Sequence, residues 1–581
     1  MFEEDKIINK AKQLCHKHSI EYKLFQSNND LFYTYKLHLP KLEIIFTYKN
    51  TEQSKAMSGV FTDLLIYLLN ITFYTNNFSS GMQAITEVDS SDRINANSPL
   101  NNYLKIFQRY YNKNGFDQMK KSLCRSKIIK STYPFISSKD ANIYYLPNSL
   151  ILALCGTNGI SAGISREVAL QKALCQISKN YVRKKIAFSN SINFPTIPLS
   201  QLNSLTMESL FQKIQADGIE IIVKDCSLNG SLPVIGLIFK KDDCAVFELG
   251  ASTNISQAIQ ECINSLGFNN IPDIHRLLTP INVLPFNSLQ RKQEYYDCLQ
   301  RKRCIFNPLL LQKVKPHTEK SISIFSDKET SSSSEQIIEN IMHLGFDVFI
   351  RNTSKRGISS YHIYIPGMSE QAVIAPDDLK FHLEYLPVSK NIFFNIKTAS
   401  VDNIKSLADT IMNLRKYCFR KENSLLSNIH HFSFYENPII NQISLESIAV
   451  LLYYQIKKYK IVARIFYKYI TTNFTVDELN FPCTQLKKSL SILKLFQYLA
   501  QGDSFETAYK KAILFYGYKF FKEIYPVLKN TNLITDYLGI IPCNDCSTCK
   551  YRNYCRFPLF KDYYKSTFNS LLNPKKVACI K

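Results

Sequence analysis

Tryptophan is absent from this sequence of 581 residues, and glycine and proline are scarce, with 17 and 21 copies. So few glycines and prolines exclude collagen-like and low-complexity architectures. The chain instead has 35 tyrosines, 38 phenylalanines and a hydrophobic content of 45%. This composition is typical of a folded chain, and because domains run to about 100 to 200 residues, its length predicts several domains rather than one small binding module.

Long apolar runs are also missing. The most apolar window, residues 60–73, is interrupted by Asp63 and Asn70, whereas a membrane-spanning helix needs about 20 apolar residues. The sequence begins Met1-Phe-Glu-Glu-Asp-Lys, with no basic region leading into an apolar run, so no secretory signal is expected. In such a chain, 16 cysteines predict reduced thiols rather than a disulfide framework. We therefore expect a cytoplasmic protein that does not contact a membrane.

Acidic residues are fewer than basic ones: 48 Asp and Glu against 71 Lys and Arg give a formal charge of +23. A basic chain can indicate a nucleic-acid partner. Here the abundance of Ile, Lys, Asn, Tyr and Phe also fits an AT-rich genome. The charge alone is therefore weak evidence for that function, and the basic runs at residues 183–185 and 301–303 are predicted to be solvated surfaces.

Apolar periodicity predicts an α/β (α+β) fold in three segments. Residues 1–130 form an N-terminal α/β segment that completes the core, and residues 131–390 form the core of repeated strand–helix units. Residues 391–581 form an all-helical domain. The expected strands are 32–39, 42–48, 143–146, 150–154, 219–224, 233–239, 245–249, 347–351 and 361–365. The expected helices are 5–17, 57–74, the segment after Ser165, 206–217, 256–266, 335–344, 398–415, 444–456, 460–472, 484–500, 504–516 and 517–528.

The most distinctive segment is a glycine-rich turn, Gly156-Thr-Asn-Gly-Ile-Ser-Ala-Gly163, that leads into a helix. It resembles the pattern S/T-N-G-x-S/A-A-G-x-T of the YcaO family, and within it the long stand-alone type with a C-terminal helical, TPR-like domain. Supporting matches follow in family order at residues 225–230, 249–251, 364–369 and 376–379. The resemblance covers most of residues 140–530 and implies a YcaO-like core.

The resemblance implies an ATP-using fold that activates a peptide-backbone amide oxygen by phosphorylation. For the long stand-alone type, it implies an accessory role in β-methylthiolation of a small-subunit ribosomal protein. Family members place Glu-x-x-Glu pairs on two related helices, where they hold Mg²⁺ against the nucleotide phosphates. One helical turn brings residues i and i+3 together, and hard cations prefer such oxygen ligands.

The acids expected in this register are missing. The corresponding positions are Gln176, Lys179 and Asn180 on the second helix, Ser265 and Phe268 on the third, and Leu68, Ile71 and Thr72 on the first. On the second helix an amide and a cation replace two anions, a change of about three charge units near a divalent metal. We therefore do not expect Mg-ATP to bind there.

Two interpretations of the second helix remain open. In one, it is a core helix of a retained fold whose ATP site is degenerate. In the other, the ATP site is displaced onto substitute acids, because acids can migrate by one helical turn. The candidates are Glu167, Asp225, Glu248 and Glu261.

A cysteine cluster lies near the end of the sequence, with the spacing C-x2-C-x2-C-x5-C. Its members are Cys543, Cys546, Cys549 and Cys555. Thiolates from one short loop can converge on one soft metal centre, so the spacing predicts an iron–sulfur cluster or Zn²⁺. The last three cysteines also resemble the C-x2-C-x5-C arm of auxiliary-cluster domains in radical-SAM peptide-modifying enzymes. The alternative is a reduced, thiol-rich loop. The scattered cysteines, Cys175, Cys226, Cys244 and Cys262, are expected to be small core residues.

The leading prediction is a catalytically degenerate accessory or scaffold factor in peptide or protein modification. Its expected partners are a protein or precursor peptide, a radical-SAM enzyme or a ribosomal protein, and a homodimer is compatible with the sequence. Two alternatives stay open. One is an active ATP-dependent enzyme of the cyclodehydratase or thioamidation class with displaced acids, and the other is an RNA- or ribosome-binding protein.

Overall fold

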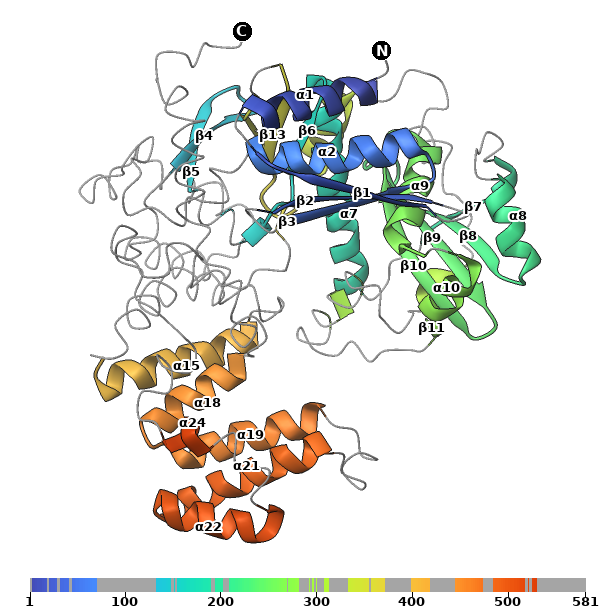
Figure 1. Cartoon of the computed structure of the whole chain (residues 1–581). Coiled ribbons are helices and arrows are strands. Elements are labelled where there is room, and N and C mark those ends of the chain that lie inside the picture. Colours follow the sequence, from blue (N-terminus) through green and yellow to red (C-terminus); the bar gives the residue numbers. More distant parts are fainter. Residues whose placement is uncertain are drawn as a thin grey trace. The chain divides into compact units, whose positions relative to one another are not determined.

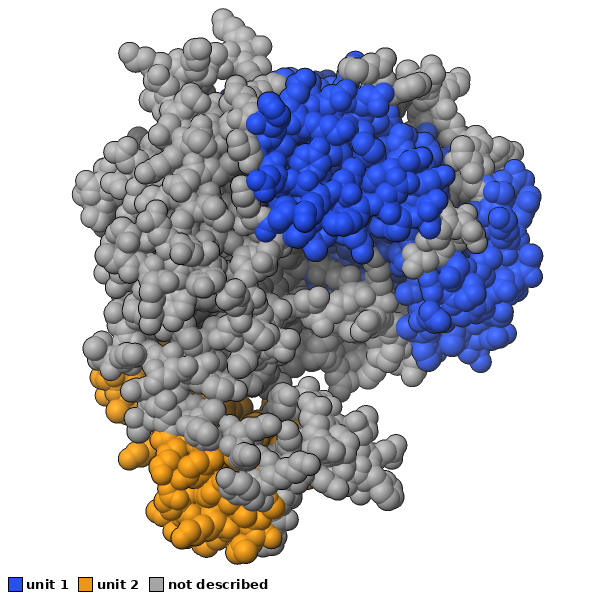
Figure 2. Space-filling model, in the orientation of Figure 1, with its two compact units in different colours: residues 1–124, 129–376, 562–581 blue, residues 125–128, 377–561 orange. Residues whose placement is uncertain are grey.

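The structure is a computed structural model in which two compact units are distinguished (Figure 2). Unit 1 comprises residues 1–124, 129–376 and 562–581, and unit 2 comprises residues 125–128 and 377–561. The described residues are 3–17, 20–28, 32–40, 44–69, 132–147, 151, 154–189, 194–201, 208–268, 270–281, 292, 295–296, 299, 308–312, 333–354, 357–370, 399–417, 445–473, 484–517, 521 and 525–529. Within them, no helix has the length and apolar character that a membrane span requires.

The N-terminal part of unit 1 is a three-stranded antiparallel sheet covered by two helices (Figure 1, blue). The strands are β1 (Lys23–Asn28), β2 (Tyr33–Leu39) and β3 (Ile44–Asn50), and the helices are α1 (Glu3–Lys17) and α2 (Gln53–Leu69). Tyr35, Leu37 and Leu39 alternate along β2 and are buried against α2. This period of two places one face of the strand in the core.

A five-stranded antiparallel sheet follows, with strand order β11-β10-β9-β8-β7. Its strands are β7 (Thr196–Ile197), β8 (Glu220–Asp225), β9 (Val234–Lys241), β10 (Cys244–Ala251) and β11 (Thr279–Pro280). The helices α8 (Glu208–Ala216), α9 (Ile255–Leu266) and α10 (Ile271–Leu277) accompany it. Helix α9 packs on β9 and β10 and begins at the N-cap Asn254, whose side chain accepts a hydrogen bond from the Gln257 amide.

The second five-stranded sheet has the order β5-β4-β12-β13-β6 and is also antiparallel. Its strands are β4 (Thr132–Ser137), β5 (Ile143–Pro147), β6 (Ile160–Gly163), β12 (Phe349–Asn352) and β13 (Ser359–Tyr364). Helix α7 (Arg166–Phe188) packs against β6 and β13 of this sheet and against β9 and β10 of the other (Figure 1). It also contacts α12 (Ser334–His343). Helix α7 therefore joins the two five-stranded sheets through one apolar core.

Unit 2 consists of helices in its described part. They are α15 (Val401–Tyr417), α18 (Leu445–Gln455), α19 (Tyr459–Asn473), α21 (Thr484–Ala500), α22 (Phe505–Tyr516) and α24 (Tyr525–Lys529). Successive helices from α15 to α22 pack against one another around a core that includes Leu452, Val462 and Leu495. The described helices agree with those expected between residues 398 and 516, whereas an all-helical domain over 391–581 and its TPR-like arrangement stay predictions.

The predicted mixed α/β fold class is confirmed, with several differences in detail. The strand expected at residues 150–154 is wrong, because Ile151, Leu154 and Cys155 are helical. Strands β1 and β4 and helix α10 were not predicted, and β6 lies inside the segment expected to be a turn. The helix expected at 57–74 begins earlier, at Gln53. Of the helix expected at 517–528, the described part contains Phe521 and α24.

Candidate functional site on helix α7

The glycine turn before α7 brings β6 next to β13 at close range. Gly159 has φ +88°, and a β-carbon at this position would lie 2.2 Å from the Ile363 carbonyl oxygen. The Ile363 amide donates to the Gly159 carbonyl at 2.8 Å. Glycine is therefore required both by the backbone conformation and by the close approach of the two strands.

Helix α7 begins directly after this turn. Ser165 is its N-cap and accepts a hydrogen bond from the Val168 amide at 3.2 Å. Ala169, Leu170, Ala173, Leu174 and Ile177 are buried in the core between the sheets. This apolar stripe fixes the rotation of the helix and thus the direction of its polar face.

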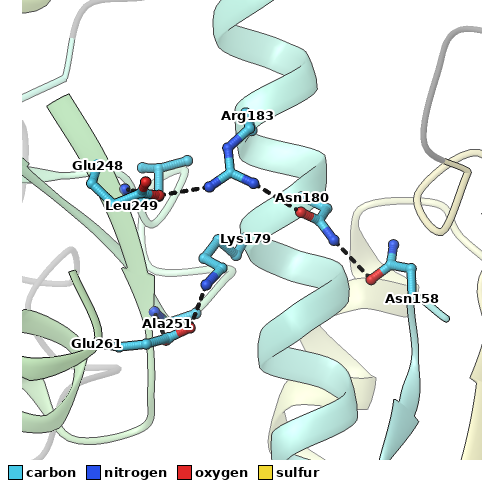
Figure 3. Close-up of polar contacts among 8 residues, drawn as sticks. All are labelled: Asn158, Lys179, Asn180, Arg183, Glu248, Leu249, Ala251 and Glu261. Atoms are coloured by element: carbon cyan, nitrogen blue, oxygen red, sulfur yellow. Dashed lines mark hydrogen bonds and ion pairs between the residues drawn. The ribbon is translucent and has the colours of Figure 1, made fainter. Parts of the chain in front are cut away.

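The polar face of α7 is connected to the turn by side-chain amides (Figure 3). Asn158 is buried and donates through Nδ2 to the Ser369 carbonyl at 2.8 Å. Its Oδ1 accepts from Asn180 Nδ2 at 3.0 Å, and Asn180 Oδ1 accepts from Arg183 Nη1 at 3.1 Å. Separately, Gln176 Oε1 accepts a hydrogen bond from the Gly159 amide at 3.3 Å. Gln176 and Asn180, two of the positions at which the sequence predicts a degenerate ATP site, thus hydrogen-bond the glycine turn.

Arg183 forms an ion pair with Glu248 of β10. Arg183 Nη2 lies 2.6 Å from Glu248 Oε1, and the exposed fractions of the two side chains are 12% and 2%. The Leu249 amide donates to the same carboxylate oxygen at 3.0 Å. A charge-assisted bond between such buried groups is stronger than a neutral one.

A second ion pair lies one helical turn earlier on α7, between Lys179 and Glu261 of α9 (Figure 3). Glu261 Oε2 also accepts from the Ala251 amide at 2.6 Å, at the end of β10. The exposed fractions are 15% for Lys179 and 38% for Glu261. Close packing brings α9 to this position, because a β-carbon on Gly250 would lie 1.9 Å from the Ala258 carbonyl oxygen.

The thiols next to these pairs are held in the neutral form. Burial raises the pKa of Cys175, and the nearby Glu261 raises it further. Burial also raises the pKa of Cys262, with Glu248 and Glu261 acting in the same direction. A neutral buried thiol is a poor nucleophile and a poor metal ligand. Cys175, Cys226 and Cys262 are buried, as predicted for core residues, and Cys244 is partly buried.

The other two candidate acids lie at structural positions outside this face. Glu167 accepts hydrogen bonds from the amide and, at 2.6 Å, from the hydroxyl of Ser334 at the start of α12. Asp225 is buried and accepts from the Ser227 amide at 2.9 Å in the turn after β8. The structure therefore brings Glu248 and Glu261 to the polar face of α7 and gives Glu167 and Asp225 separate capping roles.

The remaining mapped positions are mostly apolar. Phe268 is buried and forms edge-to-face contacts with Phe32 and Phe239 at 5.5 and 6.0 Å. Ser265 is partly buried on α9, and Leu68 is buried on α2. The other two positions on the first helix, Ile71 and Thr72, lie outside the described residues, as do Cys543, Cys546, Cys549 and Cys555.

The described part of the chain contains no group of three or more His, Cys, Asp and Glu side chains that could hold a metal ion. On the α7 face, each carboxylate is already neutralised by a cation from α7. A Mg²⁺ site needs carboxylates that face the metal, together with phosphate oxygens. The described residues of this face therefore do not fit Mg²⁺.

Two participants in this network were not singled out by the sequence prediction. Asn158 lies within the recognised motif, but its partners come from residues 180 and 369. Arg183 belongs to a basic run that was predicted to be a solvated surface, and this prediction is wrong for Arg183 and Lys184, which are 12% and 8% exposed. The sequence feature that indicates this role for Arg183 is its four-residue spacing from Lys179, which places both cations on one helix face.

Comparisons with known proteins identify the same family that the glycine turn and the helix after it resemble. The model of the YcaO cyclodehydratase family, described as binding ATP and Mg²⁺, matches residues 77–369, half of the chain. The chain belongs to the YcaO family.

Two curated relatives match over a shorter stretch. The ribosomal protein S12 methylthiotransferase accessory factor YcaO of Escherichia coli is 29% identical over 136 residues. An uncharacterized protein of Haemophilus influenzae is 28% identical over 136 residues. Each match covers 23% of this chain and 23% of the relative, so it spans about a quarter of their length.

Among solved structures, the YcaO protein resembles a heterocyclase in complex with substrate and cofactor, with 13% identity and a TM-score of 0.41. That match covers 64% of this chain and 53% of the heterocyclase. It also resembles YcaO from Methanopyrus kandleri bound with AMPPCP and Mg²⁺, with 12% identity and a TM-score of 0.40, over 63% of this chain and 91% of that chain.

Proposed function

We propose that this YcaO protein is a non-catalytic accessory or scaffold factor in the modification of a peptide or protein. The observation that supports it is the pair of ion pairs on α7, Lys179 with Glu261 and Arg183 with Glu248. Both carboxylates are committed to protein cations, and the Ala251 and Leu249 amides are further donors to them. This charge balance stabilises the contact between α7, β10 and α9 without a metal ion.

The electrostatic argument follows from the charge on α7 itself. A divalent cation placed among these side chains would meet Lys179 and Arg183 as well as two carboxylates. Because like charges at close range repel strongly when solvent is largely excluded, the two α7 cations disfavour Mg²⁺ and the nucleotide phosphates that it would hold. In this proposal the α7 face does not transfer a phosphoryl group. The YcaO fold instead provides a surface that a protein or peptide partner contacts.

The accessory role is supported by the name of the E. coli relative, an accessory factor for the methylthiotransferase of ribosomal protein S12. By analogy, we propose a protein or peptide partner for this chain, such as a ribosomal protein, a precursor peptide or a radical-SAM enzyme. We also propose that the cysteine cluster at 543–555 holds an iron–sulfur cluster or zinc for structure or electron transfer. Its thiol spacing supports this proposal.

Isothermal titration of the full chain with AMPPCP and Mg²⁺ tests the absence of a nucleotide site. We expect no saturable heat, and no phosphate release when ATP is used. The M. kandleri YcaO, whose structure holds both ligands, is the positive control.

Micromolar, Mg²⁺-dependent binding with phosphate release would contradict the proposal and favour an active enzyme with displaced acids. In that case, Glu248→Gln and Glu261→Gln would show whether those two acids are used. Glu208→Gln on the exposed start of α8 is the matched control.

A further inference from the structure

The three-stranded sheet of unit 1 has one face that points away from α1 and α2. Both helices lie on the same side of the sheet (Figure 1), and they pack with Tyr35, Leu37 and Leu39 of β2 in one core. Side chains alternate along a strand, so the residues between these three point to the other side. Of these, Lys36 is exposed and His38 is partly buried.

The strand register assigns two rows of three side chains to this face. In the first row, Lys36 of β2 lies between Phe25 of β1 and Thr47 of β3. The second row consists of Lys23, His38 and Ile45. Phe25 and Ile45 are 53% and 61% exposed, and Lys23 and Thr47 are exposed as well. The name open face is used below for the six residues of these two rows.

A third row forms one end of the sheet and is held by α9. It consists of Ser27, Thr34 and Lys49. Lys49 Nζ donates to the carbonyls of Gly267 and Phe268, at 3.3 and 2.5 Å, directly after α9. The sheet therefore contacts α9 at this row, and the open face extends from the next row onwards.

The open face has charge of one sign. The nine positions of the three rows hold three lysines, one histidine and no Asp or Glu. Interfaces form between surfaces of complementary charge, and like charges brought together disfavour binding. A second copy of this chain would place identical lysines against each other. The charge of the open face therefore fits an acidic partner and disfavours self-association through this sheet.

Two apolar side chains flank the basic centre of the open face. Because neighbouring strands lie about 4.8 Å apart and the two rows about 7 Å apart, Phe25 and Ile45 are separated by about 12 Å. The line between them crosses β2 between Lys36 and His38. In an extended peptide, residues i and i+4 lie on one side about 13 Å apart, with residue i+2 between them. The open face therefore matches the pattern apolar-x-acid-x-apolar in an extended segment.

We propose that the open face binds an extended acidic peptide segment in which two aliphatic residues flank an acid. Lys36 contacts the acid, and Phe25 and Ile45 pack on the aliphatic side chains. Single-stranded nucleic acid would also satisfy the lysines and could stack on Phe25, but Ile45 offers no ring on which a base can stack. The inference rests on the proposed peptide or protein partner and names its chemistry, but it does not depend on the state of the α7 face.

The test is fluorescence anisotropy of the full chain with a labelled peptide of four Leu-Ser-Glu-Ser repeats. This peptide places leucine and glutamate alternately on one side of an extended chain. We expect saturable binding that weakens as salt screens the charges. A peptide of four Leu-Glu-Ser-Ser repeats has the same composition but has leucine and glutamate on opposite sides, so it should bind about threefold more weakly or worse.

Two double variants separate the charged from the apolar contacts. Lys23→Gln with Lys36→Gln should weaken binding about five- to twentyfold and flatten its salt dependence, because each exposed ion pair contributes a factor of up to about five. Phe25→Ala with Ile45→Ala should weaken binding about fivefold or more without changing the salt dependence, and should abolish the difference between the two peptides. All four side chains are exposed, so the melting temperature should stay nearly unchanged.

Matched controls remove the same kinds of side chain elsewhere. Lys213→Gln removes an exposed lysine on α8, and Leu514→Ala truncates a leucine on α22 that is 84% exposed. Neither should change the affinity for the first peptide. Hydrogen exchange locates the bound peptide, which should increase the protection of residues 23–28 and 33–39 and leave α8 unchanged.

Three results would overturn the proposal. The first is no saturable binding of the Leu-Ser-Glu-Ser peptide at low salt, and the second is binding that both double variants leave unchanged. The third is oligo-dT that binds at least as tightly as the peptide and loses affinity in the lysine variant, which would assign the face to nucleic acid. These results concern the open face alone, whereas Mg²⁺-dependent nucleotide binding would contradict the non-catalytic role and leave the peptide result intact.

Discussion

Arg183, Lys184 and Lys185 are consecutive basic residues with three different environments. Arg183 pairs with Glu248, whereas Lys184 is buried and donates to the Gly367 carbonyl at 3.2 Å. Burial lowers the pKa of Lys184, and Glu370, 4.0 Å away, opposes this effect. Lys185 is exposed. Helix geometry turns each residue by about 100°, so neighbours in a charge run face different surroundings.

Arg183→Met should destabilise unit 1 by about 3 to 5 kcal/mol, because it leaves the Glu248 carboxylate buried without its cation. Urea unfolding followed by circular dichroism measures the loss. Adding Glu248→Gln removes the buried charge and should restore most of the stability. Lys185→Met, the exposed neighbour, should change the free energy of unfolding by no more than about 0.5 kcal/mol. A similar loss for both single variants would show that the buried ion pair is not the cause.

At the scale of elements, predictions succeeded where the apolar pattern was continuous and failed where it was short. The period of α7 and its Ser165 cap are visible in the sequence, and the structure has both. Strand β1, with the sequence KLFQSN, has no alternating apolar pattern that could predict it, and in the structure it is almost fully exposed. The segment around Ile151 and Leu154 is apolar enough for a strand, and only its surroundings decide that it is helical.

Helix α2 has a carboxylate whose surroundings make its stability depend on pH. Burial raises the pKa of Asp63 from 3.8 to about 6, while Lys172 of α7 acts in the opposite direction. Between about pH 4 and 6 the folded state binds more protons at this site than the unfolded state. The free energy of unfolding that Asp63 contributes therefore falls as the pH rises through this window.

Asp63→Asn should remove this contribution and make the protein more stable at pH 7. The difference in unfolding free energy between variant and wild type should grow from about pH 4 to 6 and then level off. Urea unfolding at pH 4.5, 5.5 and 7 measures it, with the exposed Asp243→Asn as the control. A constant difference across this range would mean that Asp63 titrates like an exposed carboxylate.

For the whole molecule, the two units combine a YcaO core in unit 1 with described helices in unit 2. The family match ends at residue 369, and the cysteine cluster at 543–555 lies beyond it. The ion pairs of α7 and the cysteine cluster, which are proposed to distinguish this chain from an ATP-using relative, therefore lie in separate parts of the sequence. Each can be tested without disturbing the others.

Anaerobically purified protein should contain iron and acid-labile sulfide, or zinc, in stoichiometric amount. Elemental analysis and the absorption spectrum distinguish the two, and a full complement of zinc would exclude electron transfer by the cluster. The double variant C546S, C549S should lose the metal, because it removes two of the four thiolates. Cys244→Ser, at a partly buried thiol in β10, should retain it. Metal-free wild-type protein would leave a reduced thiol loop as the interpretation of the spacing.

The sequence by itself determined the family and the mixed fold class, because these depend on local motifs and on residue identity, whereas the loss of the family's acids at Gln176 and Lys179 stays a prediction. Only the tertiary structure decided where Glu248 and Glu261 lie, since both reach α7 from elements more than 60 residues away in the chain. It also showed that Lys179 and Arg183 neutralise these acids. Ion pairs depend on distances across packed elements, and apolar packing of α7 between two sheets sets those distances.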